Sequence, residues 1–164
     1  MELTKIERLI LMNQYRILAK LYPEEEKDCE IAIKILANGY KYNYSSLFRY
    51  MDDDLSEEIS KEVFDILQMY RSLYFSYMKL EDKTGIDKDD VIFQGFDGNE
   101  ETEYYDYVYF LIKEYGRYEE FKKQELNTHY RILDKYRNML NVWKKYDKYA
   151  KLNKEQIIEI INAK

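Results

Sequence analysis

The chain has 164 residues, of which 35% are charged and 46% hydrophobic, and its formal net charge is −6. One proline and five glycines leave long stretches without a helix breaker, which predicts an all-α protein. The acidic balance argues against a general phosphate-binding surface, so nucleic acid is not expected as a partner.

The first 40 residues predict two helices. Thr4 and Glu7 form a capping box, so the first helix is expected from about Lys5 to about Leu21. Pro23 and the three glutamates after it predict the start of a second helix, which ends near residue 38. Cys29 in this helix is the single cysteine, and the N-terminus lacks a signal-peptide pattern, so we expect a cytoplasmic protein.

The first helix carries apolar side chains on two faces. One stripe is expected to face the core and to bring the amides of Asn13 and Gln14 with it; it comprises Leu3, Ile6, Ile10, Ile17 and Leu21. The other face carries Leu11, Met12 and Tyr15, where the surface helix of a monomer would be polar. These three residues are therefore the predicted interface of a homo-oligomer, most simply a dimer.

A long apolar helix at residues 57–80 is expected to be the element around which the chain folds. Ser56 is its predicted N-cap, and a short helix at 45–50 precedes it. The intervening Asp52, Asp53 and Asp54 suggest either a metal site or, as we favour, a solvated turn. Charges within the long helix exclude a membrane span.

Turn-forming residues dominate 87–99, with one short extended stretch at 91–93. Asp87, Asp89 and Asp90 lack the glycine and the final glutamate of a calcium loop, so no metal site is expected there. After Asn99, a predicted N-cap, helices are expected at 100–115, 117–123 and 128–146, and a last helix follows the capping pair Asn153 and Gln156. Residues 1–164 are thus expected to form a single domain of about six to eight helices.

Charge is unevenly distributed along the chain. Residues 128–164 hold nine basic and four acidic side chains, so the rest of the chain is strongly acidic. The basic segment either complements the acidic body or a symmetry mate, or forms an anion or nucleic-acid patch with Tyr146 and Tyr149 between its lysines. We favour the first alternative.

The sequence contains no recognisable catalytic motif. His129 is the sole histidine and lies in line with the apolar stripe of the helix expected at 128–146, so a packing role is favoured over a general base. Cys29 lies beside Asp28 and Glu30, whose charges would raise the pKa of its thiol. No catalytic residue, metal or cofactor is predicted, and an enzyme activity is not favoured.

Several short strings occur in an order and spacing that resemble the YfbU family of small bacterial proteins over nearly the whole chain. They are Arg8–Leu11, Asn13–Tyr15, Gly39–Tyr40, Phe93–Asp97, Glu114–Tyr118, Met139–Trp143 and Ile160–Ala163. The resemblance implies a multihelical cytoplasmic bacterial protein, without established catalytic residues and with a link to stress or cell-death regulation.

Two hypotheses for function follow. The favoured one is a non-catalytic, homo-oligomeric helical interaction module, whose partners are further copies of itself and other proteins. The alternative is an enzyme or nucleic-acid-linked effector whose polar cluster comprises Arg8, Asn13, Gln14, Glu114, Arg117 and Asn141. The two differ in whether these six side chains converge on one site.

Overall fold

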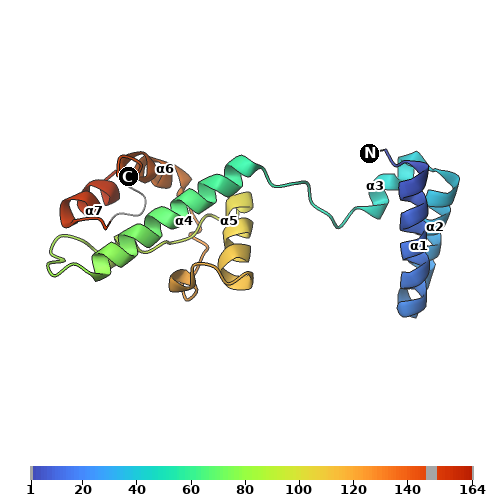
Figure 1. Cartoon of the computed structure of the whole chain (residues 1–164), viewed down its shortest axis with the longest axis horizontal. Coiled ribbons are helices and arrows are strands. Elements are labelled where there is room, and N and C mark those ends of the chain that lie inside the picture. Colours follow the sequence, from blue (N-terminus) through green and yellow to red (C-terminus); the bar gives the residue numbers. More distant parts are fainter. Residues whose placement is uncertain (1, 147–150, 164) are drawn as a thin grey trace. The chain divides into compact units, whose positions relative to one another are not determined.

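The computed structural model describes residues 2–146 and 151–163, and within them the protein is built from seven α-helices without a strand (Figure 1). The predicted all-α class is confirmed. The chain forms two compact units, Met1–Asp54 and Leu55–Lys164, called unit 1 and unit 2 here. The expectation of a single domain across residues 1–164 stays a prediction. Over the described residues, no helix is long and apolar enough to span a membrane.

Unit 1 is a helical hairpin with a short third helix. Helix α1 (Lys5–Leu21) begins with the predicted capping box of Thr4 and Glu7. A 3-10 turn at Pro23–Glu25 leads into α2 (Glu26–Asn38), which packs along α1. Gly39 ends α2 in the left-handed conformation, as a C-terminal glycine commonly does. Helix α3 (Tyr44–Leu47) starts and ends earlier than the predicted 45–50.

The assignment of the two faces of α1 was wrong. The stripe expected to face the core is largely exposed: 72% for Ile6, 53% for Ile10, 52% for Ile17 and 65% for Leu21. The opposite side, with Leu11, Met12 and Tyr15, is half-buried within the hairpin. Both faces are apolar, and helical periodicity shows where apolar residues gather but not which face a neighbour covers.

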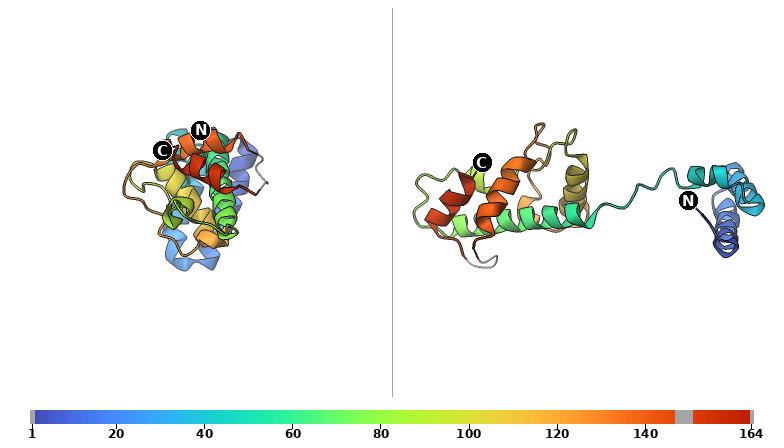
Figure 2. Two further views of the ribbon diagram at one scale, coloured as in Figure 1. Left: turned by 90° about the vertical axis from the view of Figure 1, so that its left-hand side faces the viewer. Right: turned by 90° about the horizontal axis from the view of Figure 1, so that it is seen from above.

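Unit 2 is organised around α4 (Glu57–Met78), close to the predicted helix at 57–80. Ser56 caps it, accepting a hydrogen bond from the backbone N–H of Ile59 at 3.2 Å. Helices α5 (Thr102–Tyr109), α6 (Leu133–Trp143) and α7 (Lys154–Ile161) all contact α4 (Figures 1 and 2). Seven buried hydrophobic residues of α4 therefore belong to the hydrophobic core of unit 2.

Aromatic rings from distant segments meet in this core. Tyr70 of α4 lies 5.6 Å from Phe93 and 5.2 Å from Tyr136 between ring centroids, in edge-to-face geometry. Phe96 lies 5.6 Å from Tyr136. The Tyr136 hydroxyl donates to the backbone oxygen of Gly95 at 3.0 Å, so a buried tyrosine is both packed and hydrogen-bonded. This places Tyr70 and Tyr136 in a structural role.

The segment between α4 and α6 departs most from prediction. Residues Lys88–Val91 form a 3-10 turn, so the extended stretch expected at 91–93 is wrong at its first residue. Pairing of extended backbone occurs instead at Phe96, which forms an isolated parallel bridge with Asn127. Helix α5 begins at Thr102 without a cap from Asn99, and a π-helical turn at Phe110–Glu114 continues it.

The start of α6 also lies later than expected. Residues 128–132 are not helical, and His129 adopts a left-handed conformation with φ of 57°. Its side chain is 67% exposed, so the expected packing role in an apolar stripe is wrong. A single 3-10 turn at Glu119–Phe121 replaces the helix expected at 117–123. The capping box of Asn153 and Gln156 before α7 is confirmed.

Candidate functional site

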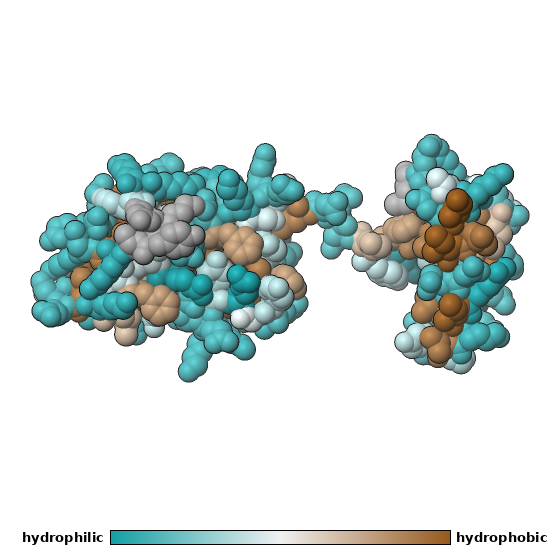
Figure 3. Space-filling model, viewed as in Figure 1, coloured by the Kyte–Doolittle hydropathy of each residue, from teal (hydrophilic) through white to brown (hydrophobic). Residues whose placement is uncertain are grey.

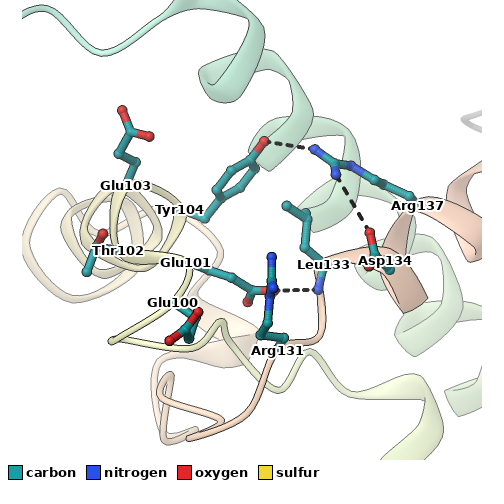
Figure 4. A pocket seen from close by; sticks show the side chains of 9 residues that line it. All are labelled: Glu100, Glu101, Thr102, Glu103, Tyr104, Arg131, Leu133, Asp134 and Arg137. Carbon is teal, nitrogen blue, oxygen red and sulfur yellow. Dashed lines mark hydrogen bonds and ion pairs between the residues drawn. The ribbon is translucent and has the colours of Figure 1, made fainter.

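In unit 2, a small pocket lined mainly by polar residues lies between the start of α5 and the start of α6 (Figure 4). Its volume is about 150 Å³. Ligand pockets for small molecules typically measure about 300–1,000 Å³. Nine residues line it: Glu100, Glu101, Thr102, Glu103, Tyr104, Arg131, Leu133, Asp134 and Arg137.

Glu101, which lines this pocket, is a buried carboxylate that bonds to two other backbone segments. Its Oε2 accepts the N–H of Asp97 at 3.0 Å, and its Oε1 accepts the N–H groups of Ile132 at 2.9 Å and Leu133 at 2.8 Å. The last two N–H groups are at the start of α6, where amides have no acceptor within the helix. A negative charge at this position also favours the helix dipole. Glu101 therefore acts as a tie between α5 and α6.

The rim of the pocket carries an ion pair between α4 and α6. Arg137 donates to Glu62 through Nε at 2.9 Å and Nη2 at 3.0 Å, in the bidentate geometry of strong pairs. The Tyr104 hydroxyl donates to the same carboxylate at 2.5 Å and accepts from Arg137 at 3.3 Å. The Arg137 guanidinium is the main reason that the pKa of Glu62 is lowered, and burial followed by the bond to Glu62 raises the pKa of Tyr104 to about 12.

Three charged groups at the pocket, Glu62, Glu101 and Arg137, form internal bonds. Glu62 and Glu101 each engage several protein donors, and Arg137 is neutralised by its partner. A general acid or base needs a proton that it can exchange with a substrate. The geometry indicates a structural junction.

The basic C-terminal region pairs with acidic residues of unit 2. Lys144 lies 3.2 Å from Asp65, and Lys154 lies 2.6 Å from Asp82. These contacts support the interpretation that the basic segment complements an acidic body. Lys148 and Tyr149, which belong to the alternative anion patch, lie outside the described residues.

The six residues of the predicted polar cluster are divided between the two units. In unit 1, Arg8 is half-buried and donates from Nη1 to the backbone oxygen of Leu36 at 3.0 Å, which ties α1 to α2. Asn13 and Gln14 are exposed on the other side of α1. The prediction that their amides are buried in the core of the chain is therefore wrong.

The remaining three residues of the cluster lie in unit 2. Glu114 ends the π-helical turn, Arg117 follows Gly116, and Asn141 is on α6. All three side chains are exposed, and none lines the pocket in Figure 4. A single site formed by all six residues remains a prediction.

Cys29 is buried between the helices of unit 1. Burial, followed by the charges of Glu25 and Asp28, raises the pKa of its thiol, in the direction predicted from its acidic neighbours. The neutral thiol is the weaker nucleophile. Cys29 is therefore best explained as a packing residue.

The surface that sequence reasoning assigned to the core is the exposed side of α1, called the outer face of α1 here. Figure 3 shows apolar surface over this helix in two patches with hydrophilic surface between them. The exposed apolar residues of the outer face are Ile6, Leu9, Ile10, Ile17, Leu18 and Leu21. Exposed apolar patches of this kind commonly mark an interaction site.

The fold and these surfaces define an all-helical protein with a helical hairpin unit and a larger unit centred on α4. A model of the YfbU domain matches residues 1–163. The UPF0304 protein MJECS11 of Methanocaldococcus jannaschii is 40% identical to the chain over 169 residues, which cover 98% of this chain and 99% of the relative. The chain belongs to the YfbU family. Because this relative is archaeal, the bacterial origin that the resemblance implied stays a prediction.

Proposed function

We propose that this chain is a non-catalytic, homo-oligomeric helical interaction module whose main contact surface is the outer face of α1. The observation that carries the proposal is that α1 has no buried residue, although isoleucine and leucine line its outer face. An apolar helix face left in water is unfavourable, and burying it against a partner recovers that free energy.

Unit 1 also has a small core of its own. Its buried hydrophobic residues are Cys29, Ala32, Leu36 and Tyr44, whereas the large hydrophobic cluster belongs to unit 2. Domains of this size bury too little surface to be very stable, and association is one of the usual remedies. A second helical layer on α1 would supply the missing core.

The pocket of unit 2 supports the non-catalytic part of the proposal. Glu101 and Arg137 of its lining, together with Glu62 beside it, form bonds that hold α4, α5 and α6 together. A regulatory role in stress or cell death, which the family resemblance implies, would act through such protein contacts and belongs to this proposal.

Light scattering of the full chain tests the proposal. At about 50 μM, a concentration at which association of moderate affinity is populated, wild type should show at least twice the chain mass of 20.2 kDa. The double variant Ile6→Glu with Ile10→Glu should fall to the monomer mass, because charge on the outer face cannot be buried unpaired.

Tyr42→Glu is the matched control, since Tyr42 is 95% exposed and lies outside α1. It should leave the mass unchanged. A monomeric wild type contradicts the proposal, and an oligomer that tolerates both outer-face substitutions contradicts the assigned surface.

A further inference from the structure

We infer that the outer face of α1 binds the same face of a second copy, with the two α1 helices antiparallel and crossing near Asn13 and Gln14. This rests on the proposed function and adds the identity, orientation and register of the partner. Four features carry it: the symmetry of the outer face, its polar centre, the charges of the helix and the area of the face.

The outer face reads nearly the same in both directions from the middle of the helix. Ile10 and Ile17 lie equally far from the midpoint between residues 13 and 14, and so do Ile6 and Leu21. A two-fold axis makes an interface self-complementary, so that each residue meets the one equally far on the other side. In an antiparallel pair through this midpoint, Ile10 lies opposite Ile17 of the second copy.

The centre of the face is polar. Asn13 and Gln14 are exposed and lie between Ile10 and Ile17 in the sequence of the helix, and each amide can both donate and accept. Amides enclosed between two helices must hydrogen-bond, and only one register brings these groups opposite each other. A polar residue within an apolar helix seam commonly specifies register in this way.

Charge and helix dipoles distinguish the two possible orientations. A parallel pair would bring Lys20 near Lys20 of the second copy and place like helix ends together. The antiparallel pair brings Lys20 to the level of Glu7 of the second copy, and each positive helix end to a negative one. The antiparallel arrangement therefore avoids repulsion along the seam.

The area is sufficient for a specific dimer. At about 200 Å² for a fully exposed isoleucine or leucine, the exposed fractions of the six outer-face residues amount to roughly 650 Å² per copy. Stable protein interfaces bury about 600–1,000 Å² on each partner. If all six side chains are covered, the outer face alone reaches the lower end of this range.

Disulfide cross-linking of the full chain tests the orientation. In a Cys29→Ala background, Ile10→Cys and Ile17→Cys are prepared separately, and then the two proteins are mixed, allowed to exchange and oxidised. An antiparallel pair brings position 10 opposite position 17, whereas two copies of position 17 lie about 10 Å apart along the helix axis. That exceeds the Cα separation of about 7 Å that a disulfide can bridge.

The expected result is that the mixture forms several-fold more covalent dimer than either variant alone. Strong cross-linking of Ile17→Cys with itself would overturn the antiparallel orientation and leave the proposed function intact. A dimer by light scattering that gives no cross-link in any sample would overturn the α1-to-α1 contact. A monomeric background protein would refute both the inference and the proposed function.

Discussion

The Oε1 atom of Glu101 accepts a hydrogen bond from the backbone N–H of Ile132, 31 positions further along the chain, at 2.9 Å. The same carboxylate accepts the N–H groups of Leu133 and Asp97. Three backbone donors thus depend on one side chain.

Replacing Glu101 should destabilise unit 2. Glu101→Ala leaves these donors without their acceptor and should lower the free energy of unfolding by about 3 kcal/mol, measured by urea denaturation. Glu101→Gln should cost less, because an amide keeps one acceptor oxygen. Glu100→Ala, at the exposed neighbouring residue, is the control. If it lowered the free energy of unfolding as much as Glu101→Ala, the assigned role of Glu101 would be contradicted.

Gly95 is expected to tolerate no side chain. Its φ is +96°, and a Cβ there would lie 1.9 Å from the backbone oxygen of Leu126. Gly95→Ala should therefore cost at least about 3 kcal/mol of stability, by strain and by displacement of the 126–128 segment. Gly85 has φ of +81° with nothing within 4 Å, so Gly85→Ala should cost only about 1–2 kcal/mol. Equal losses at the two positions would argue against the close approach.

The Glu62–Arg137 pair should make stability depend on acid pH. Arg137 lowers the pKa of Glu62 in the folded state below the ordinary value of 4.5. The ionised Glu62 therefore contributes to the free energy of unfolding above pH 4.5, and this contribution is lost as the pH falls through the folded pKa. Glu62→Gln should reduce stability by about 1 kcal/mol at pH 7, with the difference shrinking toward pH 3.

Asp134→Asn provides the matched control for this pH dependence. Asp134 lies 3.8 Å from Arg137, but its side chain is 94% exposed, so its loss should cost less stability than Glu62→Gln. Denaturant titrations at several pH values measure both variants. A difference between wild type and Glu62→Gln that stays constant from pH 7 to 3 would contradict the pairing.

The two faces of α1 should respond differently to charge. Met12 is half-buried against the hairpin, so Met12→Glu should reduce helicity by circular dichroism at every protein concentration, at a cost of about 1–2 kcal/mol. Ile6 is 72% exposed, so Ile6→Glu should leave the stability of the monomer unchanged. It should remove only the additional stability that association provides as the protein concentration rises. The opposite pattern would restore Leu11, Met12 and Tyr15 as the interface.

The sequence by itself determined the elements that depend on neighbouring residues. The caps at Thr4, Ser56 and Asn153 were all predicted, because a capping side chain bonds to amides only two or three residues away. The all-α class and the long α4 followed from composition and helical periodicity.

Only the tertiary structure decided which surfaces are covered and which distant groups meet. Both faces of α1 are apolar in sequence, and packing against α2 selected the one that carries Met12. The late start of α6 and the exposed turn at His129 coincide with the bond between Glu101 and Leu133 and with the bridge at Phe96, contacts made between segments about 30 residues apart. Local periodicity contains no information about such contacts, because they depend on how the helices pack.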